Sequence, residues 1–339
     1  MWLPKLEYDH SMDERKSLSR FINLHMPQHR APVIESLRLD FSHGYTGSVT
    51  PEDVKLWVAL AVTRSLRELR LDLYTFDQSG PAKMLVILKL KKGNLVDVPR
   101  TSCLPSLKTL LLQGVTYADQ KSLHRLLSSC PVLEDLFVEQ DGYENDQCHL
   151  LEAMITLMPK LEEMEVDSTY LDTENFVSLI TYVKRLSLCL PDQAEKALYR
   201  EGLVLNQLRH LKLCSCTINW SKLLVRLLND SPKLQELEIH LTDDHTNNCK
   251  DPPVCWENQL TCVPECLLSS LETFKWTGIY GSQKEVDLVK YVLRNARCLK
   301  TASILFRSSD SALEEDELEM VIQDLSLSSR GSKDVKLIL

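Results

Sequence analysis

Residues 232–240 read "PKLQELEIH", and this short phrase decides the fold because close variants of it return along the chain. Its apolar residues Leu234, Leu237 and Ile239 follow the order apolar-x-x-apolar-x-apolar. The last two are two positions apart, so in a strand they point to the same face, and the first lies where the chain enters that strand. The phrase therefore predicts a short strand with one buried face.

The phrase occurs eleven times between residues 32 and 306, for example as "PVIESLRLDF" (32–41), "LPSLKTLLLQG" (104–114) and "CPVLEDLFVEQ" (130–140). Successive phrases are 19 to 37 residues apart, a spacing that is typical of solenoid repeats. The middle apolar residue of each phrase serves as its marker: Leu37, Leu69, Leu88, Leu110, Leu136, Met164, Leu186, Leu211, Leu237, Phe274 and Ala302.

Amphipathic stretches with apolar residues at helical spacing lie between the phrases, such as "ADQKSLHRLLSSC" (118–130), "NFVSLITYV" (175–183) and "WSKLLVRLLNDS" (220–231). Each unit thus reads strand, turn, helix, turn. Units of this size bury their apolar faces only by stacking. The predicted fold is an α/β leucine-rich repeat solenoid, with a curved parallel sheet on the concave side and helices on the convex side. The alternative is a doubly wound α/β domain, whose strands should be more uniformly apolar.

Composition narrows the class of protein. The chain has 339 residues, 44% of them apolar, and a net charge of −9, which disfavours a nucleic-acid partner because phosphate binding requires clustered cations. Neither a membrane-spanning apolar run nor a signal peptide is evident. The eleven cysteines are odd in number and irregularly spaced, so we expect free thiols. These features predict an intracellular protein, cytoplasmic or nuclear or both, with no membrane partner.

Sequence motifs of known catalytic, phosphate-binding and metal-binding sites are scarce in this chain. Phosphate-binding glycine loops, the G-x-S-x-G elbow and the H-E-x-x-H zinc motif are all missing from the sequence. We interpret Cys214 and Cys216 as packing or turn residues of the repeat. One group in a long loop combines thiols with an imidazole but lacks the C-x2-C pair that structural zinc sites favour. Its members are His245, Cys249, Cys255, Cys262 and Cys266. We predict no metal and no cofactor.

Glu162, Glu163 and Glu165 resemble a catalytic carboxylate group. Alternate strand positions face solvent, however, and an open surface does not shift a pKa as a closed pocket does. We therefore predict no catalytic residues and no enzyme activity.

The residues that flank the strand leucines should form a binding face on the concave side. Their charges fall in bands, basic around Lys89 to Lys91 and acidic from Asp135 to Asp167, which suits selection of a charged partner by complementarity. A solvated surface of mixed charge is the open alternative. The candidate residues are Arg70, Lys89, Lys91, Phe137, Glu139, Glu163, Glu165, Asp167, Arg185, His210, Lys212, Glu236 and Glu238.

The last third of the chain resembles a known domain. Residues 255–306 contain Val263-Pro264-Glu265-Cys266-Leu267, the run "SLETFKW" (270–276), Gly278 and Tyr280. They are similar to the FBD domain found at the C-terminus of many plant F-box proteins with leucine-rich repeats. The tail "SRGSKDVKLIL" (329–339) is similar to that family's closing strand, and "HRAPVIESLRLDF" (29–41) to its entry into the repeats.

The N-terminus carries a further resemblance. In "MWLPKLEYD" the residues Trp2, Leu6 and Asp9 match a stretch that follows the last F-box helix in this family. A helix in "DERKSLSRFINLHM" (13–26), whose apolar face comprises Leu18, Phe21, Ile22 and Met26, then leads into the repeats. The expected domains are a remnant with its linker helix at 1–30, repeats at 31–245 and an FBD domain at 246–339, which we expect to continue the repeat array.

The resemblance implies a substrate receptor. In the family the F-box binds the adaptor of a cullin-RING ubiquitin ligase, the repeats hold the protein to be modified, and the chemistry lies elsewhere in the complex. The expected partner is therefore an unknown protein, with the ligase adaptor as a second partner only if the chain contains a cryptic F-box. The alternative is a truncated repeat/FBD binding protein with no role in a ubiquitin ligase.

Overall fold

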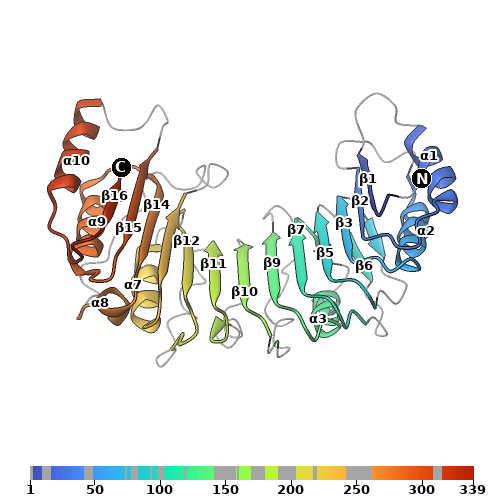
Figure 1. Ribbon diagram of the computed structural model, residues 1–339, viewed down its shortest axis with the longest axis horizontal. Helices are drawn as coiled ribbons and strands as arrows, with labels where there is room; N and C mark the ends of the chain where they lie inside the picture. The colour runs from blue at the N-terminus through green and yellow to red at the C-terminus, as the bar shows by residue number, and fades with distance from the viewer. Residues whose placement is uncertain are drawn as a thin grey trace. The chain divides into compact units, whose positions relative to one another are not determined.

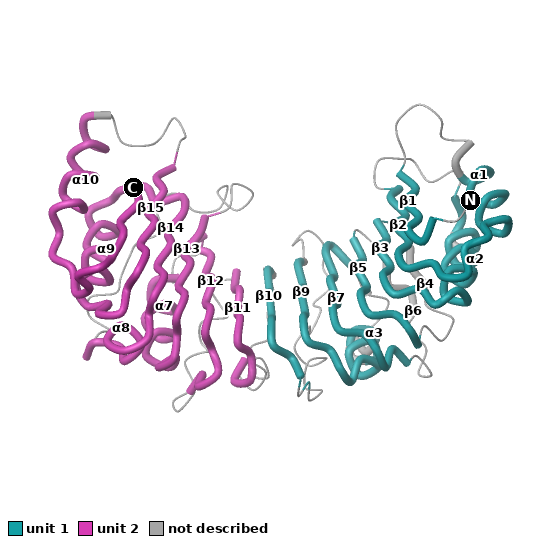
Figure 2. Tube along the Cα trace, in the orientation of Figure 1, with its two compact units in different colours: residues 1–168 teal, residues 169–339 magenta. Residues whose placement is uncertain are grey.

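A computed structural model describes residues 3–9, 17–41, 49–72, 75–77, 83–91, 94–97, 103–117, 120–140, 158, 160–168, 180–189, 204–216, 220–241, 262–307 and 315–339. The chain divides into two compact units, unit 1 at residues 1–168 and unit 2 at residues 169–339 (Figure 2). The division falls inside the predicted repeat array rather than at its predicted end. Figure 1 labels the helices and strands of both units.

Unit 1 is built on a parallel sheet whose strands lie side by side in chain order. These strands are β1 (Lys5–Asp9), β2 (Ser36–Asp40), β3 (Glu68–Asp72), β5 (Ile87–Lys91), β7 (Thr109–Gln113), β9 (Asp135–Gln140) and β10 (Glu163–Ser168). A second, small parallel sheet follows three of them. It contains β4 (Thr75–Asp77), β6 (Asn94–Asp97) and β8 (Thr116–Tyr117), in the order β4-β6-β8.

Unit 2 repeats the arrangement. Its parallel strands, again side by side in chain order, are β11 (Arg185–Cys189), β12 (His210–Cys214), β13 (Glu236–His240), β14 (Thr273–Ile279), β15 (Thr301–Phe306) and β16 (Lys336–Ile338). Strands β14 and β15 belong to the segment that resembles an FBD domain, and β14 pairs directly with β13. That segment therefore continues the sheet of unit 2.

The described helices are α1 (Ser17–Gln28), α2 (Pro51–Val62) and α3 (Gln120–Ser128) in unit 1, and α7 (Trp220–Asp230), α8 (Glu265–Ser269), α9 (Gln283–Asn295) and α10 (Glu315–Leu327) in unit 2. Helices α3 and α7 confirm two of the predicted amphipathic stretches. Of the third, residues 175–183, only the last four lie within the described residues. Repeating α/β units with parallel strands in chain order are the architecture of a leucine-rich repeat solenoid, which confirms the predicted fold class.

The marker residues form one continuous buried row within each unit. All eleven are at most 2% exposed. In unit 1 the row begins with Leu6 beside Leu37, and in unit 2 it ends with Ala302 beside Leu337. Stacked, equivalent apolar residues remove one another from water, which is the main source of stability in this architecture.

A repeated turn carries the chain into the strands. In several repeats the first apolar residue of the phrase donates its N–H to the carbonyl three residues earlier, as Leu133 does to Cys130 (3.3 Å) and Leu234 to Ser231 (3.2 Å). The next two N–H groups then share one carbonyl of the preceding repeat. Gln235 and Glu236, for example, both donate to Arg209 O, at 2.8 and 2.9 Å. The backbone N–H groups that follow each entry turn are thus hydrogen-bonded to the preceding repeat.

One detail differs from the sequence-based expectations. On α1, Ile22 and Met26 are fully buried, but Phe21 is 52% exposed, so its assignment to the apolar face was wrong. Phe21 lies beside His25 in a stacked arrangement, with ring centroids 5.2 Å apart. Ring stacking within the helix surface accommodates Phe21 without burial.

The FBD-like segment has a well-packed core. Trp276 on β14 is 1% exposed and meets Trp220 of α7 edge to face, with ring centroids 5.4 Å apart. Helix α9 begins with a capping box, in which Ser282 and Glu285 each bind the other's backbone. Gly278 has a φ of +83° at a β-bulge, and a Cβ there would lie 3.1 Å from Leu241 Cβ. Glycine is therefore required at this family-like position.

Candidate partner-binding surface

In each unit the strands of the main sheet have an open face, defined here as the face that carries the first, third and fifth residues of each strand. The second and fourth residues are buried, whereas those of the open face are mostly half-buried or exposed. All thirteen candidate binding residues lie on it and none is buried, eight in unit 1 and five in unit 2. Strand alternation thus places them as predicted; their binding role stays a prediction.

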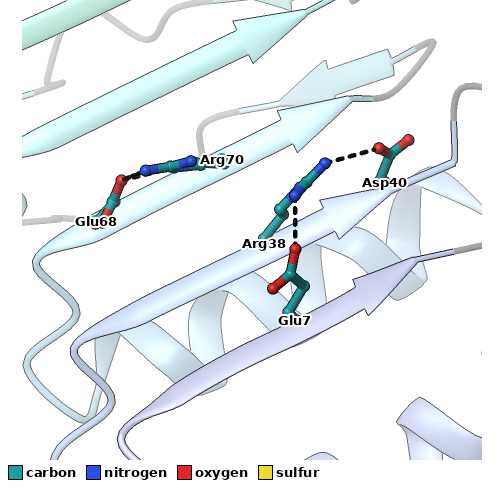
Figure 3. A network of polar contacts seen from close by, with 5 residues as sticks. All are labelled: Glu7, Arg38, Asp40, Glu68 and Arg70. Atoms are coloured by element: carbon teal, nitrogen blue, oxygen red, sulfur yellow. Dashed lines mark hydrogen bonds and ion pairs between the residues drawn. The ribbon is translucent and has the colours of Figure 1, made fainter.

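The N-terminal part of the open face in unit 1 is a network of paired charges (Figure 3). Arg38 on β2 donates to Glu7 on β1 at 2.6 Å and to Asp40 at 3.3 Å. The guanidinium of Arg70 contacts Glu68 on its own strand, also at 2.6 Å. Arg70 is therefore already paired, whereas no ion pair joins Lys89 or Lys91 to another residue in the described part of unit 1.

An apolar pair, Leu111 and Phe137, occupies the centre of this face. The pairing of β5, β7, β9 and β10 places Lys89, Leu111, Phe137 and Glu165 side by side in that order. Leu111 was absent from the sequence-based set. The run Leu110-Leu111-Leu112 carried the signal, because a strand with one buried face should have a polar residue at its middle position.

Carboxylates cover the far side of the apolar pair. Asp135 and Glu139 on β9 accept hydrogen bonds from Thr109 Oγ1 and Gln113 Nε2, each at 3.0 Å. Strand β10 adds a carboxylate at its first, third and fifth positions, namely Glu163, Glu165 and Asp167. Across the adjacent strands β5, β7, β9 and β10, the open face of unit 1 therefore presents lysines, then an apolar pair, then carboxylates.

The open face of unit 2 is largely self-paired. His210 Nδ1 lies 3.1 Å from Glu236 Oε2, and Lys275 Nζ lies 3.4 Å from Glu238 Oε1. Lys275 was also absent from the sequence-based set; it is the third residue of β14, in the FBD-like segment. Side chains of opposite sign on neighbouring strands thus pair within this face.

The fifth, open-face positions of β11, β12 and β13 are Cys189, Cys214 and His240. The sulfurs of Cys189, Cys214 and Cys216 all lie within 4.8 Å of one another. Hydrogen bonds with Cys214 and Cys216, together with burial, raise the pKa of Cys189 far above its ordinary value. On the next strand, burial lowers the pKa of His240. The Cys189 thiol is therefore protonated and the His240 imidazole neutral near pH 7.

The loop group considered as a metal site is not assembled within the described residues. His245, Cys249 and Cys255 lie outside them. Cys262 is exposed, whereas Cys266 is buried and donates to Leu228 O at 3.4 Å. Burial raises the pKa of Cys266 to about 12, so it behaves as a packed thiol.

Comparison with known proteins places the chain in a family. A family model described as FBD matches residues 258–304, and a leucine-rich repeat model matches residues 106–131. A putative F-box/FBD/LRR-repeat protein of Arabidopsis thaliana is 46% identical, covering 98% of this chain and 89% of the relative. A putative F-box/LRR-repeat protein of the same plant is 47% identical, covering 86% of this chain and 82% of the relative.

The chain belongs to the F-box/FBD/LRR-repeat family. In the first of these alignments the 397 positions exceed the roughly 332 residues that 98% of 339 supplies. About 65 positions of that relative therefore have no counterpart in this family member. Family membership indicates a protein-interaction role. In the described part of the chain, no helix is both long and apolar enough to cross a bilayer.

Proposed function

We propose that this F-box/FBD/LRR-repeat family member is a non-catalytic receptor that holds a protein partner on the open face of unit 1. The observation that carries the proposal is the row Lys89, Leu111, Phe137, Glu165 on four adjacent strands. Apolar side chains on a mainly polar sheet face are typical anchors of protein interfaces, and the flanking charges set orientation. Domain bounds of 1–30, 31–245 and 246–339 remain part of the proposal.

The charges predict the chemistry of the partner. A segment bound across the strands should place acidic residues over Lys89 and Lys91, an apolar side chain on Leu111 and Phe137, and basic residues over the carboxylates of β9 and β10. Opposite charges speed encounter and reject segments of reversed polarity. The partner is therefore a protein segment of the order acidic, apolar, basic.

Selection of peptides from a random display library against the full chain tests this surface. We expect enriched peptides with that charge order, and we expect Phe137→Ser to weaken their binding at least about tenfold, because a buried aromatic anchor contributes more than 1.4 kcal/mol. Met320→Ser is the matched control, since Met320 is 70% exposed on α10, away from the sheet. Peptides without charge order, or binding that survives Phe137→Ser, would contradict the proposal.

A link to ubiquitination is the finer part of the proposal. The names of the relatives support it, because both include an F-box. As a receptor the chain would supply proximity and orientation, with the transfer chemistry carried by other subunits. Binding of the purified chain to the ligase adaptor, measured by pull-down, supports that role. A chain that binds the selected peptides but not the adaptor would instead favour a repeat/FBD binding protein that works outside a ubiquitin ligase.

A further inference from the structure

Three thiols from two separate stretches of the sequence meet at the carboxyl ends of two neighbouring strands in unit 2. Cys189 ends β11, Cys214 ends β12, and Cys216 lies two residues beyond. Their sulfurs are all within 4.8 Å of one another, and the Cys189 and Cys216 sulfurs are 3.4 Å apart. This cluster is separate from the proposed partner-binding row, which lies in unit 1.

The fold explains why the thiols meet. Strands β11 and β12 are parallel and in register up to Leu188 beside Leu213, so the residues that follow, Cys189 and Cys214, lie side by side at the ends of their strands. Neighbouring strands are about 4.8 Å apart, a distance that two thiol side chains readily bridge. Ser215 then donates its N–H to His240 O on β13 at 2.8 Å, which holds the chain in position for Cys216.

The cluster differs from the other buried thiols. Cys130 donates to Leu126 O at 3.2 Å and Cys266 to Leu228 O at 3.4 Å, so each uses a backbone carbonyl. Cys189 instead forms hydrogen bonds with the two other thiols of its own cluster. Thiols are weak hydrogen-bond donors and acceptors, so a convergent group of three gains little from such contacts.

We propose that Cys189, Cys214 and Cys216 form a zinc site, with His240 as the fourth ligand. Zinc–sulfur bonds of about 2.3 Å in a tetrahedron place sulfurs about 3.8 Å apart, so the observed 3.4 Å pair and 4.8 Å limit need only small side-chain adjustments. Soft thiolates with one imidazole select zinc over the hard ions calcium and magnesium. Three thiol protons leave to solvent as three Zn–S bonds form, without electron transfer.

His240 suits the fourth position because it is paired with Cys214 in the sheet register. Its Nδ1 is buried and has no hydrogen-bond partner in the described residues, which is costly for a ring nitrogen unless something binds it. The imidazole also interacts with the backbone of Leu213. An outer hydrogen bond of that kind commonly orients a zinc-ligating histidine. A turn of the ring toward the sulfurs completes the set.

Titration of the reduced, metal-free full chain with Zn²⁺ against a chromophoric chelator tests the site. We expect one equivalent to bind, with three sulfurs in the first shell by X-ray absorption. Cys189→Ser and His240→Ala should each weaken binding at least about tenfold. Cys298→Ser is the control, because Cys298 is an exposed cysteine whose sulfur lies near Ser269 O, outside the cluster. It should leave the affinity unchanged.

Alkylation of the unmodified chain gives an answer that does not depend on variant folding. Zn²⁺ should protect Cys189, Cys214 and Cys216 from a thiol reagent, as read by peptide mass spectrometry, while Cys298 stays reactive. The proposal is overturned if the folded chain takes up no zinc, or if zinc protects other cysteines. Binding that survives His240→Ala overturns the assignment of the fourth ligand. A Cys189–Cys216 disulfide that forms readily on mild oxidation, with no zinc uptake, would identify a redox pair instead.

Discussion

The main-sheet strands of the two units share the same buried rows but differ in their open faces. In both units the second position of each of these strands is apolar, and in all of them except the terminal strand β16 it is at most about 4% exposed. On the open face, the fifth positions of unit 1 are mainly acidic, as in Asp40, Asp72 and Asp167, whereas those of β11 to β13 in unit 2 are Cys189, Cys214 and His240. Packing constrains the buried rows, so the open positions are where one repeat architecture can acquire two chemistries.

The largest expected effects test the shared buried rows. Trp276→Ala should lower the free energy of unfolding by about 3–5 kcal/mol, because it leaves a cavity beside Trp220. Leu136→Ala, in the matching row of unit 1, should cost about 2–5 kcal/mol. Denaturant titration of the full chain measures both. Trp276→Phe is the milder control, since the indole Nε1 has no hydrogen-bond partner among the described residues. A small effect of either alanine variant would show that its row is not a close-packed core.

Two capping boxes offer a second comparison between the units. Thr50 accepts from Asp53 N at 3.2 Å at the start of α2, and Ser282 and Glu285 form the equivalent box at α9. Thr50→Ala and Ser282→Ala should each cost about 1 kcal/mol of unfolding free energy, measured by thermal or urea unfolding. In both boxes the capping hydroxyl also donates to the carboxylate, Thr50 to Asp53 at 3.0 Å and Ser282 to Glu285 at 2.9 Å. We expect the larger loss for Ser282→Ala, because Glu285 is buried whereas the Thr50–Asp53 bond is exposed. Equal losses would show that burial of the capping box adds nothing to its contribution to the free energy of unfolding.

The same boxes should respond to pH in opposite directions. Burial raises the pKa of Asp53, but hydrogen bonds from Thr50 and Asn23 outweigh it, so the folded-state pKa lies below the ordinary 3.8. This contribution is present above pH 3.8 and is lost as pH falls through the folded value. Burial raises the pKa of Glu285 above 4.5 despite its hydrogen bonds. Its protonated form is favoured by folding, so stability is lost as pH rises from 4.5 through the folded value.

Paired variants measure this contrast. Asp53→Asn should remove a rise in stability with pH, and Glu285→Gln should remove a fall, when unfolding free energies are compared between about pH 3 and pH 7. Slopes of the same sign for the two variants would contradict the burial difference between the boxes.

The smallest expected effect concerns the paired charges of Figure 3. Arg38→Ala should change the unfolding free energy by no more than about 1 kcal/mol, because the Glu7 side chain is 61% exposed and water screens the pair. High salt should reduce the difference further. Urea titration at two salt concentrations measures it. A large, salt-independent loss would show that this network is structural rather than a solvated part of the open face.

Much of the fold was predictable because the repeat is local. The spacing of Leu234, Leu237 and Ile239 predicts strand and buried face together, and every marker residue proved to be buried. Exceptions arose where contacts outside the repeat phrase determine which side chains are buried. Phe21 has helical spacing with Leu18, three residues earlier, yet it lies against His25 at the surface. Leu111 required the register of β7 with its neighbours to show that it faces outward between Lys89 and Phe137.

By itself the sequence determined the repeat, the buried rows and the family-like C-terminal segment, since each depends on residue order over about ten to fifty positions. Only the tertiary structure decided which open-face residues become neighbours. Cys189 and Cys214 are distant in the sequence, and parallel pairing of β11 with β12 brings their sulfurs together. Backbone hydrogen bonds between paired strands set the distances between such side chains, and no local pattern in the sequence encodes those distances.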